Sequence, residues 1–98
     1  MTAIDVACVE TDPGSWTCAV RVRDDRSSSD HEVLVDEIDL PAALDGAEVA
    51  DVERLVEASF RFLLERESKE SILRRFDLSV IRRYFPEYPD EIERRVGA

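Results

Sequence analysis

The N-terminal part of the chain contains two segments in which apolar and polar side chains alternate, Ile4-Asp5-Val6-Ala7-Cys8 and Trp16-Thr17-Cys18-Ala19-Val20-Arg21-Val22. This alternation is typical of strands with one buried face. Asp12-Pro13-Gly14-Ser15 between them predicts a turn, because proline presets φ and glycine tolerates a positive φ. The segments therefore predict a β-hairpin. Matching their apolar faces places Ile4 opposite Val22, Val6 opposite Val20 and Cys8 opposite Cys18.

The pattern continues beyond the hairpin. Residues 24–30 are polar and rich in serine, which indicates a mobile loop without a core residue. From His31 to about Ile38 the apolar side chains of Val33, Leu34 and Val35 predict a third strand. Consecutive strands with short links favour an antiparallel meander over residues 1–40.

A long amphipathic helix is predicted over residues 45–67. Asp45 and Glu48 fit an N-terminal capping box. The apolar stripe at helical spacing comprises Val49, Val52, Leu55, Val56, Phe60, Phe62, Leu63 and Leu64. This helix would cover one face of a sheet that is only marginally stable by itself.

Residues 68–98 predict two or three short helices. The first runs from Ser68 to about Phe76, and the second covers residues 80–85 and ends before Pro86, because proline cannot continue a helix. A last helix begins near Pro89. We therefore expect one α+β domain over residues 1–98, with a three-stranded antiparallel sheet covered by one long helix and followed by two or three short C-terminal helices.

Composition narrows the classes of function. The chain has 98 residues, 44% of them hydrophobic and 37% charged, and a net charge of −10. No apolar run approaches the roughly 20 residues needed to cross a bilayer, and the N-terminus lacks the features of a secretory signal. We expect an acidic cytoplasmic protein that does not bind membranes.

The two cysteines and the single histidine are the residues to test for a metal site. The spacing of Cys8, Cys18 and His31 matches no metal-binding pattern, and cysteines on apolar strand faces usually act as small hydrophobic side chains. We expect two buried free thiols, with a disulfide and a zinc site as the alternatives. His31 adjoins the polar loop and is interpreted as a surface imidazole. No metal and no cofactor are predicted.

No catalytic residue is predicted either. With 23 acidic residues, neighbouring carboxylates arise by chance, whereas acid–base catalysis needs a pocket and a shifted pKa. An enzyme with an unrecognised site is therefore the second alternative.

The candidate binding residues lie towards the C-terminus. Residues 58–84 carry seven basic and four acidic side chains, and Tyr84-Phe85-Pro86-Glu87-Tyr88-Pro89 places three aromatic residues among prolines. If these aromatics are exposed, they form an interface anchor with a charged rim. If they are buried, they fix the C-terminus to the fold. The partner-binding candidates are Arg74, Arg75, Arg82, Arg83, Tyr84, Phe85 and Tyr88.

The same arginines allow another interpretation. A short helix, a break and a second short helix over residues 70–85 would be like a helix-turn-helix that binds nucleic acid. Pro86 shortens the second helix, however, and the charge of −10 opposes binding to a polyanion. We predict a non-catalytic protein-interaction or accessory module that binds another protein or a second copy of itself, with nucleic-acid binding as the first alternative.

The segment from residue 62 to residue 88 also resembles one found in small uncharacterised bacterial proteins. The similarity is carried by Phe62-Leu63-Leu64-Glu65-Arg66-Glu67, Lys69-Glu70-Ser71-Ile72-Leu73, Phe76-Asp77-Leu78-Ser79-Val80-Ile81 and Tyr84-Phe85-Pro86-Glu87-Tyr88. This resemblance implies a bacterial protein. It implies no activity and no site residue.

Overall fold

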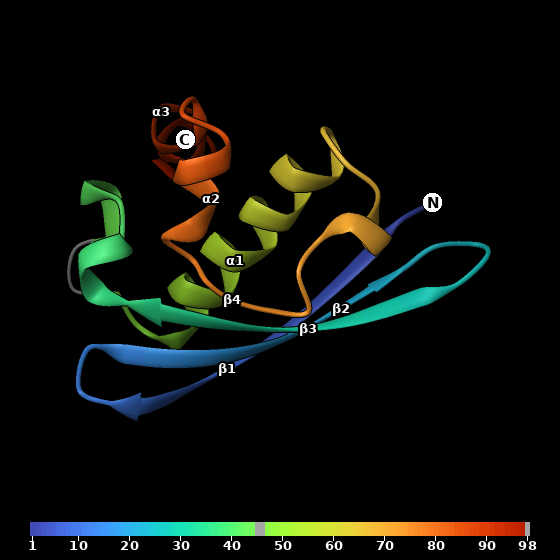
Figure 1. The fold of residues 1–98 in the computed structure, drawn as a ribbon. Helices are drawn as coiled ribbons and strands as arrows, with labels where there is room; N and C mark the ends of the chain where they lie inside the picture. The colour runs from blue at the N-terminus through green and yellow to red at the C-terminus, as the bar shows by residue number, and fades with distance from the viewer. Residues whose placement is uncertain (45–46, 98) are drawn as a thin grey trace.

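A computed structural model describes residues 1–44 and 47–97 as a four-stranded sheet with helices on one face (Figure 1). The strands β1 (Ala3–Asp12), β2 (Ser15–Arg23) and β3 (Ser28–Asp36) form an antiparallel meander. The hairpin register is confirmed, with Ile4 opposite Val22, Val6 opposite Val20 and Cys8 opposite Cys18. Gly14 has a φ of 79° in the turn, a conformation that favours glycine.

β3 begins earlier than the sequence suggested. Ser28, Ser29 and Asp30 were expected in a mobile loop, but they pair with β2. The Asp30 carboxylate also accepts a hydrogen bond from Nε of Arg21 at 2.8 Å. Polar side chains on the uncovered part of a sheet fit a strand as well as a loop, so polarity alone misplaced this boundary.

The sheet also has a fourth strand, β4 (Arg75–Asp77), which lies parallel to β3. The prediction of a three-stranded antiparallel sheet is therefore wrong, because the sheet is mixed and has the order β1-β2-β3-β4. The prediction of a helix from Ser68 to about Phe76 is wrong as well. A short 3₁₀ helix, η3 (Lys69–Ser71), precedes β4 instead. The strand is favoured because Phe76 is buried against the core while the backbone pairs with β3.

The helix α1 (Val49–Leu64) crosses the sheet and is shorter than the predicted span of 45–67. Its N-cap is Glu48, whose backbone N–H donates to the Asp51 carboxylate at 3.0 Å. The predicted cap, Asp45, lies outside the described residues. The 3₁₀ helices η1 (Glu37–Asp39) and η2 (Ala42–Leu44) lie between β3 and α1. Two of the predicted C-terminal helices are confirmed as α2 (Val80–Tyr84) and α3 (Tyr88–Gly97).

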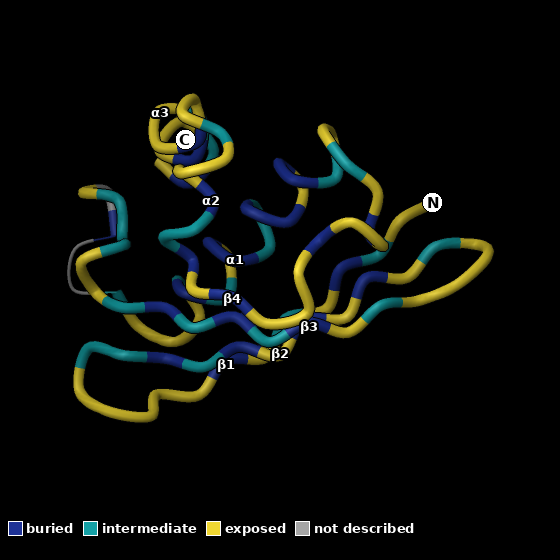
Figure 2. Tube along the Cα trace, viewed as in Figure 1, coloured by how far each residue is buried: buried dark blue, intermediate teal, exposed yellow. Residues whose placement is uncertain are grey.

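The core fills the space between the sheet and α1 and continues from α1 to α3, as the buried segments in Figure 2 show. The Phe60 ring lies on the sheet side, 5.3 Å from the ring of His31 and 6.0 Å from that of Phe76. The Phe62 ring lies 5.8 Å from Phe85 and 5.2 Å from Tyr88. No described helix has the length and apolar character that crossing a membrane requires.

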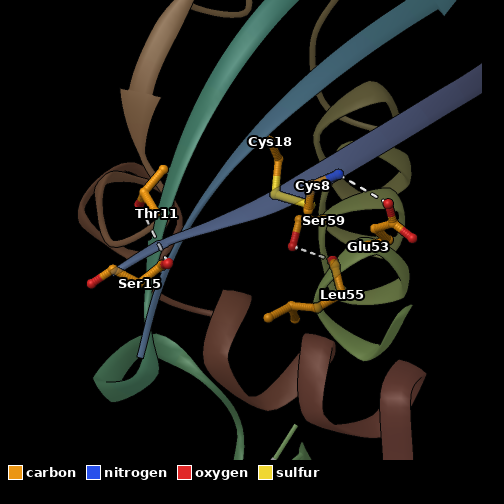
Figure 3. The surroundings of a disulfide bond; sticks show 7 residues. All are labelled: Cys8, Thr11, Ser15, Cys18, Glu53, Leu55 and Ser59. Atoms are coloured by element: carbon orange, nitrogen blue, oxygen red, sulfur yellow. Dashed lines mark hydrogen bonds between the residues drawn. A yellow bond between two sulfur atoms is a disulfide. The ribbon is translucent and has the colours of Figure 1, made fainter. Parts of the chain in front are cut away.

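Cys8 and Cys18 form a disulfide that joins β1 to β2 near α1 (Figure 3). The prediction of free thiols is wrong. The register places the two cysteines directly opposite each other on the core face, with their Cα atoms 4.0 Å apart. The backbone N–H of Cys8 also donates to the Glu53 carboxylate of α1 at 2.9 Å. This hydrogen bond joins the edge strand β1 to the helix α1.

His31 is buried, so its interpretation as a surface imidazole is wrong. Its Nδ1 lies 2.8 Å from the Leu73 carbonyl oxygen, and its Nε2 lies 2.8 Å from the Ser29 hydroxyl. Because a carbonyl can only accept, Nδ1–H donates to Leu73. In the neutral ring, Nε2 then accepts from Ser29. The imidazole therefore fixes the segment before β4 to strand β3.

Candidate protein-binding groove

An apolar groove of about 490 Å³ opens beside β4. One wall comes from the segment that leads into β4, and the other from α2 and the residue after it. The base comes from the C-terminal end of α1 together with Phe76 of β4 and Ile81 of α2. The lining residues are Leu63, Glu67, Ser71, Ile72, Leu73, Phe76, Val80, Ile81, Tyr84 and Phe85. A hollow of this size and apolar character is typical of binding sites.

Two large apolar side chains of the groove are exposed. Leu73 on one wall is 52% exposed and Tyr84 on the other is 70% exposed. Between them, Phe76 and Ile81 belong to the buried core. The groove therefore has a fixed apolar base and two side chains that lose water only when another molecule covers them.

Polar contacts hold the first wall in place. Besides the bond from His31 to the Leu73 carbonyl, the N–H of Glu32 donates to the carbonyl of Arg74 at 2.7 Å. The buried Lys69 ammonium donates to the carboxylates of Asp24 at 2.6 Å and Glu70 at 2.9 Å. The Lys69 ammonium and two backbone N–H groups hold the pKa of Asp24 well below its usual range. Both ends of this wall are therefore tied to the sheet and its loops.

The second wall rests on the ring of Phe62. Phe85 meets that ring edge-on, and the guanidinium carbon of Arg66 lies 3.6 Å from the ring centroid. Arg66 also pairs with Glu87, just beyond α2, at 3.1 Å. Because Phe85 packs against Phe62 in the interior, the side chain of the neighbouring Tyr84 is exposed to solvent.

Tyr88 lies in the core and does not line the groove. Its hydroxyl is 2.7 Å from that of Ser59, whose own hydrogen goes to the Leu55 carbonyl at 2.8 Å. The Tyr88 hydroxyl is therefore the donor to Ser59. Burial raises the pKa of Tyr88 to about 12. Of the three predicted aromatic candidates, Tyr84 is exposed, Phe85 is half-buried and Tyr88 fixes α3 to α1.

The four candidate arginines are exposed but have different surroundings. Arg75 pairs with Glu32 at 3.3 Å, and Arg82 borders a smaller hollow that also includes Asp39. Arg74 and Arg83 directly adjoin Leu73 and Tyr84 in the chain. Within residues 1–44 and 47–97, no carboxylate lies at ion-pair distance from either of these two.

Leu73 and Val80 were not among the candidate residues, although both line the groove. Leu73 follows Ile72 directly in the chain. In an extended segment, neighbouring side chains point to opposite sides, so only one of the two can enter the core. The adjacent apolar residues Ile72 and Leu73 were therefore the signal in the sequence that one of them is exposed. The prediction of a helix over residues 68–76 hid this signal, because a helix can bury both.

No protein-family model, curated protein or solved structure matches this chain. The assignment of a function therefore rests on the groove itself.

Proposed function

We propose that this chain is a non-catalytic protein-interaction module that binds an apolar segment of another protein in the groove. The observation that carries the proposal is the pair of exposed side chains, Leu73 and Tyr84, on opposite walls above a buried base. Large apolar anchors of this kind contribute most of the binding energy in protein interfaces. The polar residues of the lining, Glu67 and Ser71, are few beside its apolar side chains, which favours binding over catalysis.

Nucleic-acid binding has less support than protein binding. The helix expected over residues 70–76 is replaced by η3 and β4, so the helix-turn-helix arrangement has lost its first helix. Arg75 already pairs with a carboxylate, and Arg82 borders a different hollow from the one lined by Tyr84.

A cytoplasmic location stays a prediction. The Cys8–Cys18 disulfide is a feature more typical of proteins in oxidising compartments.

Selection from a library of random linear peptides tests the proposed function. Peptides enriched on the wild-type protein are measured for affinity to wild type, Leu73→Ser, Tyr84→Ser and the double variant. We expect each single variant to weaken binding about tenfold, as is typical of a truncated interface anchor.

Val9→Ser is the matched control. Val9 is an exposed apolar residue, 61% accessible, and its position in β1 places it on the uncovered face of the sheet. This variant should bind the peptides like wild type, and all variants should keep the wild-type circular dichroism spectrum. The proposal is wrong if no peptide is enriched, or if the double variant binds the peptides as tightly as wild type does.

A further inference from the structure

We infer that the bound segment is extended, adds to the sheet as a strand along β4, and carries acidic residues beside its apolar anchors. This inference rests on the proposed function, because it names the kind of segment that the groove accepts.

The first support is the open edge of β4, the last strand in the order β1-β2-β3-β4. The Arg74 carbonyl accepts from Glu32, and the Leu78 N–H donates to the Leu34 carbonyl at 2.9 Å. Hydrogen-bonding directions alternate along a strand, so the N–H and C=O groups of Arg75 and Asp77 face away from β3. The described part of the chain supplies no hydrogen bond to these groups. An incoming strand can pair with them.

The opposite edge of the sheet is protected. On β1 the N–H of Cys8 is already bound by the Glu53 carboxylate at 2.9 Å. The register of β1 also shifts between Glu10 and Asp12, where a bulge or similar irregularity interrupts the regular pairing. A side chain on the edge and a bulge both hinder the addition of a strand. The contrast favours β4 as the receiving edge.

The groove lies where an added strand would need it. Residues that are opposite each other in paired strands point to the same face of the sheet. Phe76, the central residue of β4, lines the groove. The residue paired with Phe76 would therefore place its side chain in the groove, near Leu73 and Tyr84. A bound helix could fill the groove, but it would leave the Arg75 and Asp77 backbone groups unpaired.

Charge complementarity defines the rest of the segment. Arg74 and Arg83 adjoin the two exposed anchors in the chain, outside the lining of the groove, and have no carboxylate within 4.0 Å in the described chain. Arg74 also lies near enough to Asp30 to contribute to the lowered pKa of that carboxyl. Aspartate or glutamate beside the apolar residues of the segment would pair with them. A net charge of −10 repels acidic segments from the molecule as a whole, so acidic residues of the segment should lie at the rim beside these two arginines and away from Glu67 of the groove.

The selected peptides are the probes for this inference. We expect their apolar residues at alternate positions with acidic residues between them. At saturating peptide, hydrogen exchange at the Arg75 and Asp77 amides should slow at least about tenfold, because these amides become paired.

Backbone methylation of the peptide provides the sharpest comparison. N-methyl groups at the alternate amides that face β4 should weaken binding at least about tenfold. The same groups at the intervening amides, which face solvent, should leave the affinity unchanged. Both peptides keep every side chain, so the difference reports backbone pairing alone.

The variant Arg74→Gln plus Arg83→Gln tests whether acidic residues of the segment pair with these arginines. Arg82→Gln, from the same helix as Arg83, is the matched control. We expect the double variant to weaken binding about tenfold and to reduce its dependence on salt, while the control changes neither. If the double variant and the control bind the peptides equally well, the inference that the segment carries acidic residues is wrong.

The outcomes separate the two proposals. If Leu73→Ser and Tyr84→Ser each weaken binding about tenfold while both methylated peptides bind alike and the two amides stay unprotected, the proposed function stands and strand addition is wrong. A helical spacing of the apolar residues in the peptides would also overturn strand addition. If the groove variants bind like wild type, the proposed function fails, and this inference fails with it.

Discussion

Phe60 and Phe62 are both fully buried on α1, but they face regions that are built differently. Phe60 meets the sheet through His31 and Phe76, in a layer held by backbone pairing and a disulfide. Phe62 meets the C-terminal segment, where two aromatic rings and the Arg66 guanidinium surround it. The sheet layer is therefore held by backbone hydrogen bonds and a disulfide, whereas the C-terminal layer depends on the packing of side chains, among them those around Phe62 and the buried Ile92 and Val96 of α3.

Ion pairs add little to the C-terminal layer. Arg95 of α3 pairs with Glu65 at 2.8 Å and with Glu91 at 3.4 Å, and these groups are partly or largely exposed. Water screens pairs of this kind, so they contribute little to stability. The attachment of α3 should then depend mainly on apolar packing, through Phe62 of α1 and the buried Tyr88, Ile92 and Val96 of α3.

The largest expected effect tests this difference directly. Phe62→Ala and Phe60→Ala should each lower the free energy of unfolding by about 3–5 kcal/mol, since each empties a buried ring position. In Phe62→Ala, hydrogen exchange should speed up first in α3, with β1 and β2 still protected. In Phe60→Ala the amides of both layers should lose protection together. Equal protection of α3 and the hairpin in Phe62→Ala would show that the layers are not separable.

The next effect concerns the disulfide. Cys8→Ala plus Cys18→Ala should lower the free energy of unfolding by about 3 kcal/mol, because the bond closes a short loop in the unfolded chain. The effect is on the unfolded state, so amides that exchange by global unfolding should change equally in both layers.

Urea unfolding with and without a dithiol reductant measures the disulfide effect. Wild type should shift to a lower midpoint in the reductant, and the double variant should not shift. A wild-type midpoint that is unaffected after complete reduction would contradict the prediction.

The smallest effect at neutral pH is expected for Tyr88→Phe, which removes the donor to Ser59 and should cost about 1 kcal/mol. At high pH Tyr88→Phe should become more stable than wild type. The pKa of Tyr88 is raised to about 12 in the folded chain, so the folded chain holds this proton more tightly than the unfolded chain does. The protonated Tyr88 hydroxyl therefore contributes fully to the free energy of unfolding below about pH 10. This contribution, on the order of 2 kcal/mol, is lost as the pH rises towards 12.

Urea midpoints across this alkaline range measure the reversal. Tyr88→Phe should be the less stable protein at pH 7 and should lose less stability than wild type above pH 10. Parallel curves for the two proteins would show that Tyr88 is not held neutral by burial.

The hairpin and α1 could be predicted because their patterns are long and regular. Ile4, Val6 and Cys8 alternate in step with Val22, Val20 and Cys18, so a shift by one residue would turn every apolar side chain to solvent. The same register already placed the two cysteines opposite each other. The expectation of free thiols came from the assumed compartment and from the apolar strand faces that carry both cysteines, and the register was not applied to their pairing.

β4 could not be predicted by the same reasoning. A strand of Arg75, Phe76 and Asp77 is too short to show an alternation, and the spacing of Ile72 and Phe76 matches a helical turn. His31 shares strand parity with Val33 and Val35, so its burial was readable, but the adjoining polar loop suggested otherwise. Of the candidate site residues, Tyr84 and Phe85 line the groove, and the cluster of aromatic residues among prolines was the signal that identified them. Leu73 was missed because its wall depends on β4.

The parallel pairing of β4 with β3 has a consequence for how the chain acquires its groove. β1 and β2 meet across a tight turn, whereas Arg75 reaches Glu32 only after the whole of α1 has been laid across the sheet. Closing a longer loop costs more entropy, and such distant contacts form late in folding. The hairpin can therefore exist in a chain that has no groove, because one wall is positioned only when β4 docks. Competence to bind should thus be acquired late in folding, and a chain in which β4 has not docked should lack the docking surface even where the disulfide-linked hairpin has formed.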